Sequence, residues 1–304
     1  MKISNFETLK NKLTESNRVR IVIASASEEE ILLANEANAL ADFILLGDES
    51  KMLKVMKERG IDSSKFQLIH MENHHKTAKQ AIQLIHEGKA DIPMKGALHT
   101  STFMSAVLNK ETGLERTRRL SQITIFEHAE QLRFLTDCAI NIETDLKTKH
   151  DIILNGVSLA RAFGIDTPKV ALLGAVETVN EKMEDTMISA ALTQMNRRGQ
   201  IANCLVDGPL SLDNAISKEA AVQKGIVSDV AGLADILVGS CLQEANSLSK
   251  SLNFYANIST ASVIVGTKQP IIMTSRTDKK ENKINSIAAT CYYQAEQIGR
   301  NADV

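Results

Sequence analysis

The chain has 304 residues, of which 43% are hydrophobic and 24% are charged, and its 35 Lys and Arg against 37 Asp and Glu give a net charge of −2. This composition is typical of a folded globular protein with one large or two smaller domains, and it excludes a disordered or fibrous chain. The lack of a basic excess and the absence of Trp argue against nucleic-acid binding as the main role.

The N-terminal segment and the cysteines point to a reducing compartment. The first twenty residues contain neither an apolar stretch nor a small-residue cleavage site, so we expect no signal peptide. No apolar run approaches the roughly 20 residues that a membrane-spanning helix needs. Cys138, Cys204, Cys241 and Cys291 form no CxxC pair, which favours buried or free thiols over a zinc site or a redox pair. We therefore expect a cytoplasmic protein that does not bind membranes.

The first half of the chain predicts short buried strands that alternate with helices. We expect strands at residues 20–24, 43–46, 66–71, 92–94, 123–126 and 133–139, with the last two close together. Helices are expected after the capping residue Ser27 and over residues 50–59 and 76–87. Gly60 and Gly88 follow two of these helices, at the position where glycine commonly ends a helix.

The second half repeats this alternation. Helices are expected at residues 149–163, 186–198, 217–224, 244–255 and 283–298. Strands are expected at residues 169–173, 202–206, 234–238, 262–265 and 271–274. The pattern predicts an α/β fold with mostly parallel sheets and flanking helices. Because ligands bind beyond the carboxyl ends of strands in such sheets, the loops that follow the strands are the places to look for a site.

Two of these loops carry groups that suit an anion. Ser275 and Arg276 follow the last expected strand and precede the last helix, so a hydroxyl, a guanidinium and helix N–H groups come together there. Lys95, His99 and Thr100 follow the strand at 92–94 and open a helix, although no Walker A motif is present. In both loops the alternative is an ordinary polar turn with solvated charges.

Two further loops carry charged residues. Arg116, Arg118 and Arg119 precede the strand at 123–126 and are suited to clamping a polyanion, although a solvated basic loop is the alternative. Asp207 follows the strand at 202–206, where it is an acid, a base or only a hydrogen-bond acceptor of the loop.

The sequence gives little indication of a metal site or of a nucleotide-binding site. His70, His74 and His75 are close in sequence, but the strand at 66–71 places His70 and His74 in different elements, so we expect no metal site. The motifs HExxH, GxSxG and GxGxxG are absent, which argues against zinc peptidases, α/β-hydrolases and a simple dinucleotide site.

Several of these segments, taken in order, resemble the phosphate acetyl/butyryltransferase family, most closely its phosphate butyryltransferase branch. The matching segments are residues 94–114, 118–126, 151–183, 204–217, 230–238 and 274–288. The most distinctive are VDGPLSLDNAIS, which begins at Val206, and Thr274-Ser275-Arg276. Any one of these segments alone is a weak signal, whereas the ordered set is specific.

The resemblance implies a reaction and a fold. The implied reaction is the reversible conversion of a short-chain acyl-CoA and phosphate into acyl phosphate and CoA by direct acyl transfer. CoA is then a co-substrate, and no permanently bound cofactor or metal is expected. The implied fold is that of the isocitrate and isopropylmalate dehydrogenases. One domain is expected at residues 1–133 plus 264–304 and the other at residues 134–263, with the active site in the cleft between them.

The resemblance also implies roles for individual residues. Ser275 and Arg276 match the family's pair that contacts phosphate and the transition state. Arg119, or alternatively Arg118, matches an arginine that precedes a strand. A carboxylate beyond the Ser-Arg pair is expected to act as the general base, with Asp278 the nearest and Glu281 the alternative. Our expected catalytic residues are Ser275, Arg276 and Asp278, and the expected substrate-binding residues are Lys95, His99, Thr100, Arg118, Arg119 and Asp207.

Several positions depart from the family pattern, among them Ser228-Asp229, where the family has Gly-Pro. Gln243 removes a charge, Ala245 adds a Cβ where the family has glycine, and Ile188 lies in a segment that differs from the family's. These departures keep two alternatives open: a non-catalytic or regulatory relative that binds CoA or phosphate, and a phosphate acetyltransferase. An oxidoreductase would need metal-binding carboxylates and a nucleotide site that the sequence lacks. A homodimer or higher homo-oligomer is the default expectation.

Overall fold

The computed structural model describes residues 2–14 and 18–302, which divide into two compact units. The terminal unit contains Phe6–Thr117 and the residues from Ala261 onward, and the central unit contains Arg118–Thr260 and the N-terminal residues through Asn5. The expected change of domain after residue 133 lies 16 residues (133 − 117) beyond the observed boundary at 117/118. Both units contain a largely parallel sheet with flanking helices, so the expected α/β class is confirmed.

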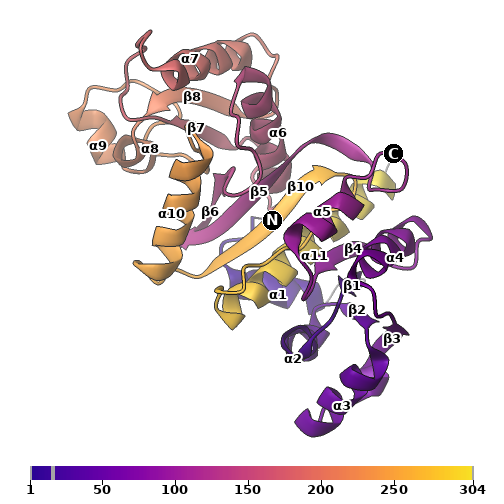
Figure 1. Ribbon diagram of the computed structural model, residues 1–304. Coiled ribbons are helices and arrows are strands. Elements are labelled where there is room, and N and C mark those ends of the chain that lie inside the picture. The colour runs from indigo at the N-terminus through magenta and orange to yellow at the C-terminus, as the bar shows by residue number, and fades with distance from the viewer. Residues whose placement is uncertain (1, 15–17, 303–304) are drawn as a thin grey trace. The chain divides into compact units, whose positions relative to one another are not determined.

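The terminal unit has a four-stranded parallel sheet in the order β3-β2-β1-β4. Its elements are α1 (Phe6–Thr14), β1 (Arg20–Ala24), α2 (Glu28–Glu36), β2 (Asp42–Gly47), α3 (Glu49–Arg59), β3 (Phe66–His70), α4 (His74–His86), β4 (Ile92–Lys95), α5 (Thr100–Val107), β10 (Thr260–Thr267) and α11 (Lys280–Ala302), with 3₁₀ turns at Ala37–Ala39 and Ser63–Lys65. Helix α4 packs against β1, β2 and β4, and α11 packs against α1, α2 and β4 (Figure 1).

The residues that begin and end these helices explain their bounds. The Glu30 carboxylate accepts hydrogen bonds from the Ser27 N–H (2.9 Å) and Oγ–H (2.5 Å), which fixes the start of α2. The Asp48 carboxylate accepts from the Lys51 N–H (3.1 Å) at the start of α3. Gly60 ends α3 with φ of +65°, a left-handed conformation that glycine adopts without strain.

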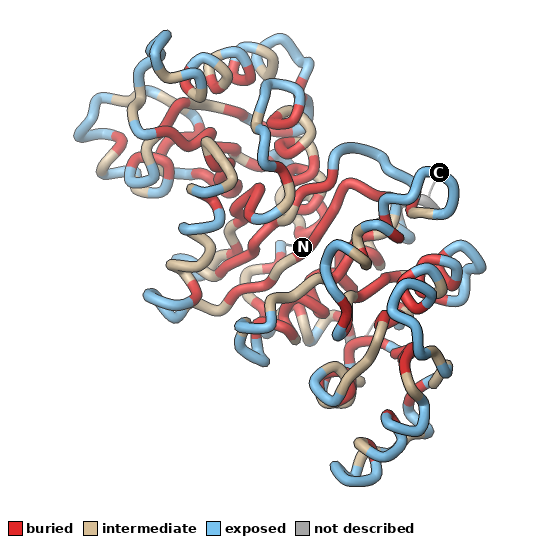
Figure 2. The backbone as a smooth tube through the Cα atoms, viewed as in Figure 1, coloured by how far each residue is buried: buried red, intermediate tan, exposed pale blue. Residues whose placement is uncertain are grey.

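In the central unit, five strands of a six-stranded sheet follow the order β5-β6-β9-β7-β8, and among these five only β5 and β6 pair in antiparallel fashion. Its elements are β5 (Arg116–His128), β6 (Gln131–Thr136), α6 (Leu146–Ala162), β7 (Lys169–Leu173), α7 (Glu184–Arg197), β8 (Leu205–Leu210), α8 (Leu212–Ile216), α9 (Lys218–Gln223), β9 (Ile236–Val238) and α10 (Leu242–Phe254). The strands of both sheets are largely buried, which explains their apolar sequences (Figure 2).

Several sequence-based expectations require correction. The strand expected at 202–206 begins at Leu205 and continues through Gly208-Pro209 to Leu210. A Cβ at Gly208 would lie 2.6 Å from Leu172 Cβ, so glycine allows close packing inside the sheet at this position. Residues 271–274 form only isolated bridges at Ile271 and Ile272. Helices α1 and α8 were not predicted.

The cysteines match the expectation of buried or free thiols. The four cysteines are free thiols, and Cys138, Cys204 and Cys291 are buried. Burial raises the pKa of Cys204 to about 11 and that of Cys138 to about 12. Across residues 2–14 and 18–302, no helix combines the length and the apolar character that crossing a lipid bilayer requires.

Candidate active site

The loops after β1 and β4 are bonded to each other at the carboxyl edge of the terminal unit's sheet. The Gly96 N–H donates to the Ala24 carbonyl (2.9 Å), and the Ala97 N–H donates to the Ser25 carbonyl (2.7 Å). A Cβ at Gly96 would lie 2.3 Å from the Ser25 oxygen, a distance that no side chain tolerates. β1 pairs with β2 on one side and with β4 on the other, so this edge is the point where the strand order reverses, the usual place for a ligand.

A distant segment of the chain completes this edge. Ile272 accepts from the Lys95 N–H (3.0 Å) and donates to the Pro93 carbonyl (3.1 Å), so it lies alongside the end of β4. Thr274, Ser275 and Arg276 follow immediately. Two of the segments that the sequence singled out, around Lys95 and around Ser275, therefore come together in one place.

The Ser-Arg segment forms a tight turn that Asp278 closes. The Asp278 carboxylate accepts from the Ser275 N–H (2.8 Å), and the Asp278 N–H donates to the Ser275 carbonyl (3.2 Å). The Ser275 and Thr277 hydroxyls are 3.0 Å apart. Asp278 thus holds the backbone of Ser275 directly.

The Lys95 and Ser275 segments enclose a small hollow of about 110 Å³. Its lining residues are Ser27, Glu29, Glu30, Lys95, Gly96, Ala97, Thr274, Ser275, Arg276 and Lys283. The volume corresponds to about four waters at roughly 30 Å³ each, so it suits a small anion rather than a nucleotide.

The charges around the hollow favour an anion. Lys283 forms an ion pair with Glu29, and Glu30 is engaged by Ser27. In the part of the chain that the structure describes, no carboxylate forms an ion pair with Arg276 or Lys95. Burial lowers the pKa of Lys95, and the nearby cations Arg276 and Lys283 lower it further, against the opposite effect of Glu30 and Glu29. A bound anion would relieve the repulsion between these cations.

Not all of the expected substrate-binding residues join the hollow. His99 precedes α5 without a side-chain hydrogen bond to the start of the helix, and Thr100 is the first residue of α5. Both are exposed, and neither lines the hollow. Arg118 and Arg119 belong to the central unit, inside β5 rather than before a strand. The exposed start of β5 lacks the apolar alternation that would have revealed it.

Arg119 and Asp207 have partners within the central unit. The Arg119 N–H donates to the Asp151 carboxylate (3.2 Å), and the Arg119 carbonyl accepts from Asn155 (2.7 Å). Asp207 lies within β8 and accepts from the Gly208 N–H (2.9 Å), so it is not beyond a strand end as expected.

The sequence interpretation missed a buried lysine in the central unit. Lys149, in the first turn of α6, is 2% exposed. Burial lowers its pKa, against the opposite effect of Asp185 and Glu244. A signal for it was present, because Lys149 shares the helical spacing of the buried residues Ile152, Ile153 and Gly156.

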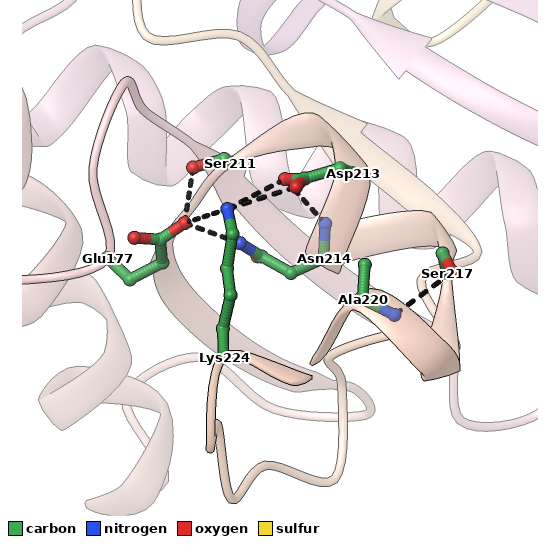
Figure 3. A network of polar contacts seen from close by, with 7 residues as sticks. All are labelled: Glu177, Ser211, Asp213, Asn214, Ser217, Ala220 and Lys224. Carbon is green, nitrogen blue, oxygen red and sulfur yellow. Dashed lines mark hydrogen bonds and ion pairs between the residues drawn. The ribbon is translucent and has the colours of Figure 1, made fainter. Parts of the chain in front are cut away.

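A carboxylate in the loop after β7 anchors a polar network that the sequence interpretation also missed. Glu177 accepts from the Ser211 hydroxyl (2.5 Å), the Asn214 amide (2.6 Å) and the Lys224 ammonium (2.7 Å) (Figure 3). Lys224 also pairs with Asp213 (3.0 Å). The network joins the loop to the VDGPLSLDNAIS segment, which therefore has a structural role in the central unit.

The network predicts a pH-dependent stability. The Lys224 and Ser211 hydrogen bonds lower the pKa of Glu177 from 4.5 to about 2. We expect Glu177→Gln to lower the free energy of unfolding by about 1–2 kcal/mol at pH 7, a value that allows for solvent screening. The stabilisation is complete above pH 4.5 and is lost as the pH falls toward 2, so the deficit of the variant shrinks over that range.

Urea unfolding at several pH values measures this effect. Glu219→Gln on α9 is the matched control, because Glu219 is exposed and bonds only to Gln223 at 3.2 Å among the partners that the structure describes. Equal stability losses for Glu177→Gln and Glu219→Gln would contradict the role of the network.

The described residues offer no candidate metal centre. They contain no group of three or more His, Cys, Asp or Glu side chains that could hold a metal ion. His70 lies at the end of β3 and accepts from the Glu49 N–H (3.3 Å), whereas His74 begins α4 and lies 3.0 Å from the Ser25 hydroxyl. The two histidines thus fall in different elements, as the sequence indicated.

Comparison with known proteins identifies similar sequences and structures. Residues 71–291 match the family described as "Phosphate acetyl/butaryl transferase". The chain is 40% identical to the phosphate butyryltransferase of Clostridium acetobutylicum over 94% of this chain and 97% of that protein. It is 39% identical to the phosphate acetyltransferase of Rhizobium meliloti over 93% of this chain and 91% of that protein. The crystal structure of a branched-chain phosphotransacylase from Enterococcus faecalis superposes with a TM-score of 0.82 at 30% identity, covering 91% and 99% of the two chains.

Proposed function

Because the chain belongs to the phosphate acetyl/butaryl transferase family, we propose that it transfers a short acyl group reversibly between CoA and inorganic phosphate. The observation that carries this proposal is the hollow in which Lys95, Ser275 and Arg276 come together. Its size and its cations suit phosphate, the acceptor that the family name implies. CoA is then a co-substrate rather than a bound cofactor.

The proposed chemistry follows from the residues around the hollow. Arg276 and Lys95 bind phosphate through charge-assisted hydrogen bonds and neutralise its charge. A phosphate oxygen attacks the thioester carbonyl, the carbon–sulfur bond breaks, and the CoA thiolate leaves and takes up a proton. The Ser275 hydroxyl donates to the oxygen that becomes negative in the transition state. In the reverse direction the thiolate attacks the acyl phosphate, and phosphate leaves.

The general base remains a proposal with two candidates. The Asp278 carboxylate accepts a hydrogen bond from the Ser275 N–H, so its first role in this proposal is to position Ser275. In the direction that consumes CoA, Asp278 or Glu281 removes the thiol proton. Glu281 lies in the first turn of α11.

The remaining expectations are also proposals. We propose that His99, Thr100, Arg118, Arg119 and Asp207 contribute to substrate binding, although only Lys95 of the expected binding residues lines the hollow. The two compact units, each with a helix-flanked and largely parallel sheet, support the isocitrate and isopropylmalate dehydrogenase-like fold. We further propose that the protein forms a homodimer or a higher homo-oligomer.

The acyl group is proposed to have about four carbons. The 40% identity to a phosphate butyryltransferase over nearly the whole chain supports butyryl. A similar identity to a phosphate acetyltransferase makes acetyl the alternative.

Phosphate-dependent release of CoA thiol tests the function. We expect release from butyryl- or isobutyryl-CoA to exceed release from acetyl-CoA, measured with a thiol reagent at increasing phosphate. Omission of phosphate controls for simple hydrolysis. A folded protein that binds CoA but releases no thiol from any of the three would contradict the proposal and support the non-catalytic alternative.

A further inference from the structure

The first half of β5 extends beyond its pairing with β6. The paired residues of the two strands run from Thr124 with Leu135 to His128 with Gln131, so this pairing does not include residues 116–123. Backbone N–H and C=O groups that leave a ladder need other partners. Side chains of the central unit bond several of these groups.

Two side chains of α6 hold the peptide groups of Arg119. The Arg119 N–H donates to the Asp151 carboxylate (3.2 Å), and the Asn155 amide donates to the Arg119 carbonyl (2.7 Å). The same amide donates to the Ser121 hydroxyl (2.8 Å). Asp151 and Asn155 are four positions apart (155 − 151), so they lie one turn apart on one face of the helix. We call these two residues the α6 clamp.

The loop after β6 holds the next residues of β5 in the same way. The Asn141 amide donates to the Leu120 carbonyl (2.7 Å) and to the Asp137 carboxylate (2.6 Å). The Asp137 carboxylate also accepts from the Gln122 N–H (2.9 Å). Asp137 and Asn141 are both buried. Side chains therefore fix the backbone of β5 from residue 119 to residue 122.

The α6 clamp is largely buried, whereas the side chain of the residue that it holds is exposed. Asn155 is 2% exposed, and Arg119 is an exposed residue. In the part of the chain that the structure describes, the Arg119 guanidinium forms no ion pair. Hydrogen bonds from Thr148 lower the pKa of Asp145, and the charge of Arg119 lowers it further. Hydrogen bonds of this kind contribute little net stability, because each replaces a bond to water. What they do fix is the direction in which the guanidinium leaves the backbone.

We propose that the α6 clamp positions Arg119 to bind a phosphate group of a substrate, an inference that rests on the proposed function. Asp151 and Asn155 are positioning residues, because they contact the Arg119 backbone rather than the substrate. A guanidinium binds phosphate through two parallel hydrogen bonds, which require a defined orientation. The phosphate group is that of the inorganic acceptor or one of those of CoA.

A double-mutant cycle separates positioning from a structural role. Arg119→Ala removes the guanidinium but keeps both peptide groups that the clamp holds. We expect Asn155→Ala to lower kcat/KM about tenfold in the wild-type background and less than about twofold in the Arg119→Ala background, because misplacement matters only while the guanidinium is present. Urea unfolding is expected to show the same loss of stability in both backgrounds. The rise in KM, for phosphate or for acyl-CoA, shows which phosphate group Arg119 binds.

Two further variants control for charge and for stability. Asp151→Asn keeps an oxygen that accepts from the Arg119 N–H, so we expect kcat/KM to stay within about twofold, whereas Asp151→Ala lowers it about tenfold. Asn109→Ala is the matched control, because the Asn109 side chain also bonds backbone groups, the N–H of Glu111 and that of Thr112 (2.9 Å each). We expect Asn109→Ala to lower stability and to leave kcat/KM unchanged.

Three results would overturn the inference. Equal losses of kcat/KM for Asn155→Ala in both backgrounds would show that Asn155 acts independently of Arg119. Wild-type kcat/KM in Arg119→Ala would show that Arg119 binds no phosphate group. A loss in Asp151→Asn as large as that in Asp151→Ala would assign the effect to the charge of the carboxylate. In all three cases the wild-type protein still transfers acyl groups, so the proposed function stands. A wild-type protein that acts on no acyl-CoA would overturn both.

Discussion

Replacing Arg276 with Ala is expected to lower kcat/KM for phosphate by roughly 100- to 1,000-fold. Arg276 and Lys95 line the small hollow, and neither forms an ion pair with a carboxylate among the residues that the structure describes. A guanidinium that is not neutralised by the protein is available to bind an anion through two parallel hydrogen bonds. Initial rates of thiol release at varied phosphate and at saturating acyl-CoA measure the loss.

The Arg276 prediction has two useful controls. Arg198→Ala removes an exposed arginine at the end of α7 and is expected to leave both kcat and KM unchanged. Arg276→Lys retains the charge but loses the planar pair of donors, so we expect an intermediate loss, mainly in KM for phosphate. A normal KM for phosphate in Arg276→Ala would show that the hollow is not the phosphate site.

Replacing Gly96 with Ala is expected to reduce both stability and activity. The added Cβ would lie 2.3 Å from the Ser25 carbonyl oxygen and 2.5 Å from the Ala24 carbonyl oxygen. Because both are backbone atoms, the clash is relieved only if the loops after β1 and β4 separate. We expect a loss of about 1–3 kcal/mol in the free energy of unfolding, as for overpacked sites. Because the same contact positions Lys95, we also expect acyl transfer to fall at least tenfold in protein that is still folded.

Urea unfolding and the thiol-release assay measure the two effects of Gly96→Ala. Gly299→Ala is the matched control, because Gly299 lies in α11 with no atom within 4 Å of its added Cβ. Alanine there favours the helix and is expected to stabilise the protein by about 0.5–1 kcal/mol. Wild-type activity in Gly96→Ala would contradict a positioning role for the contact between the two loops.

The order of strands and helices could largely be predicted from the sequence because local signals determine it. β1 and β7 have the bounds that their apolar runs predicted, and Ser27 and Gly60 mark helix ends as expected. Prediction failed where packing overrides local preference. The strand expected to end at residue 206 continues through Gly208-Pro209, where close packing against Leu172 requires glycine.

The candidate site could be predicted in part. Lys95, Ser275 and Arg276 come together as the chemistry of their loops suggested. Lys283 and Glu29 were not predicted, because their ion pair joins helices far apart in sequence, and no local pattern encodes such a pair. Glu177 was missed for the same reason, since its partners are 34 to 47 residues away.

The pairing of Ile272 with the end of β4 has a consequence for how the protein is made. Met94 and Ile272 are bridge partners separated by 178 residues (272 − 94). During synthesis the whole central unit therefore leaves the ribosome before residues 274–276, which line the small hollow, have been made. Domains fold as units while the chain emerges, so the central unit is complete while the terminal unit still lacks this segment. Nascent chains that stop before residue 276 are expected to have no phosphate site.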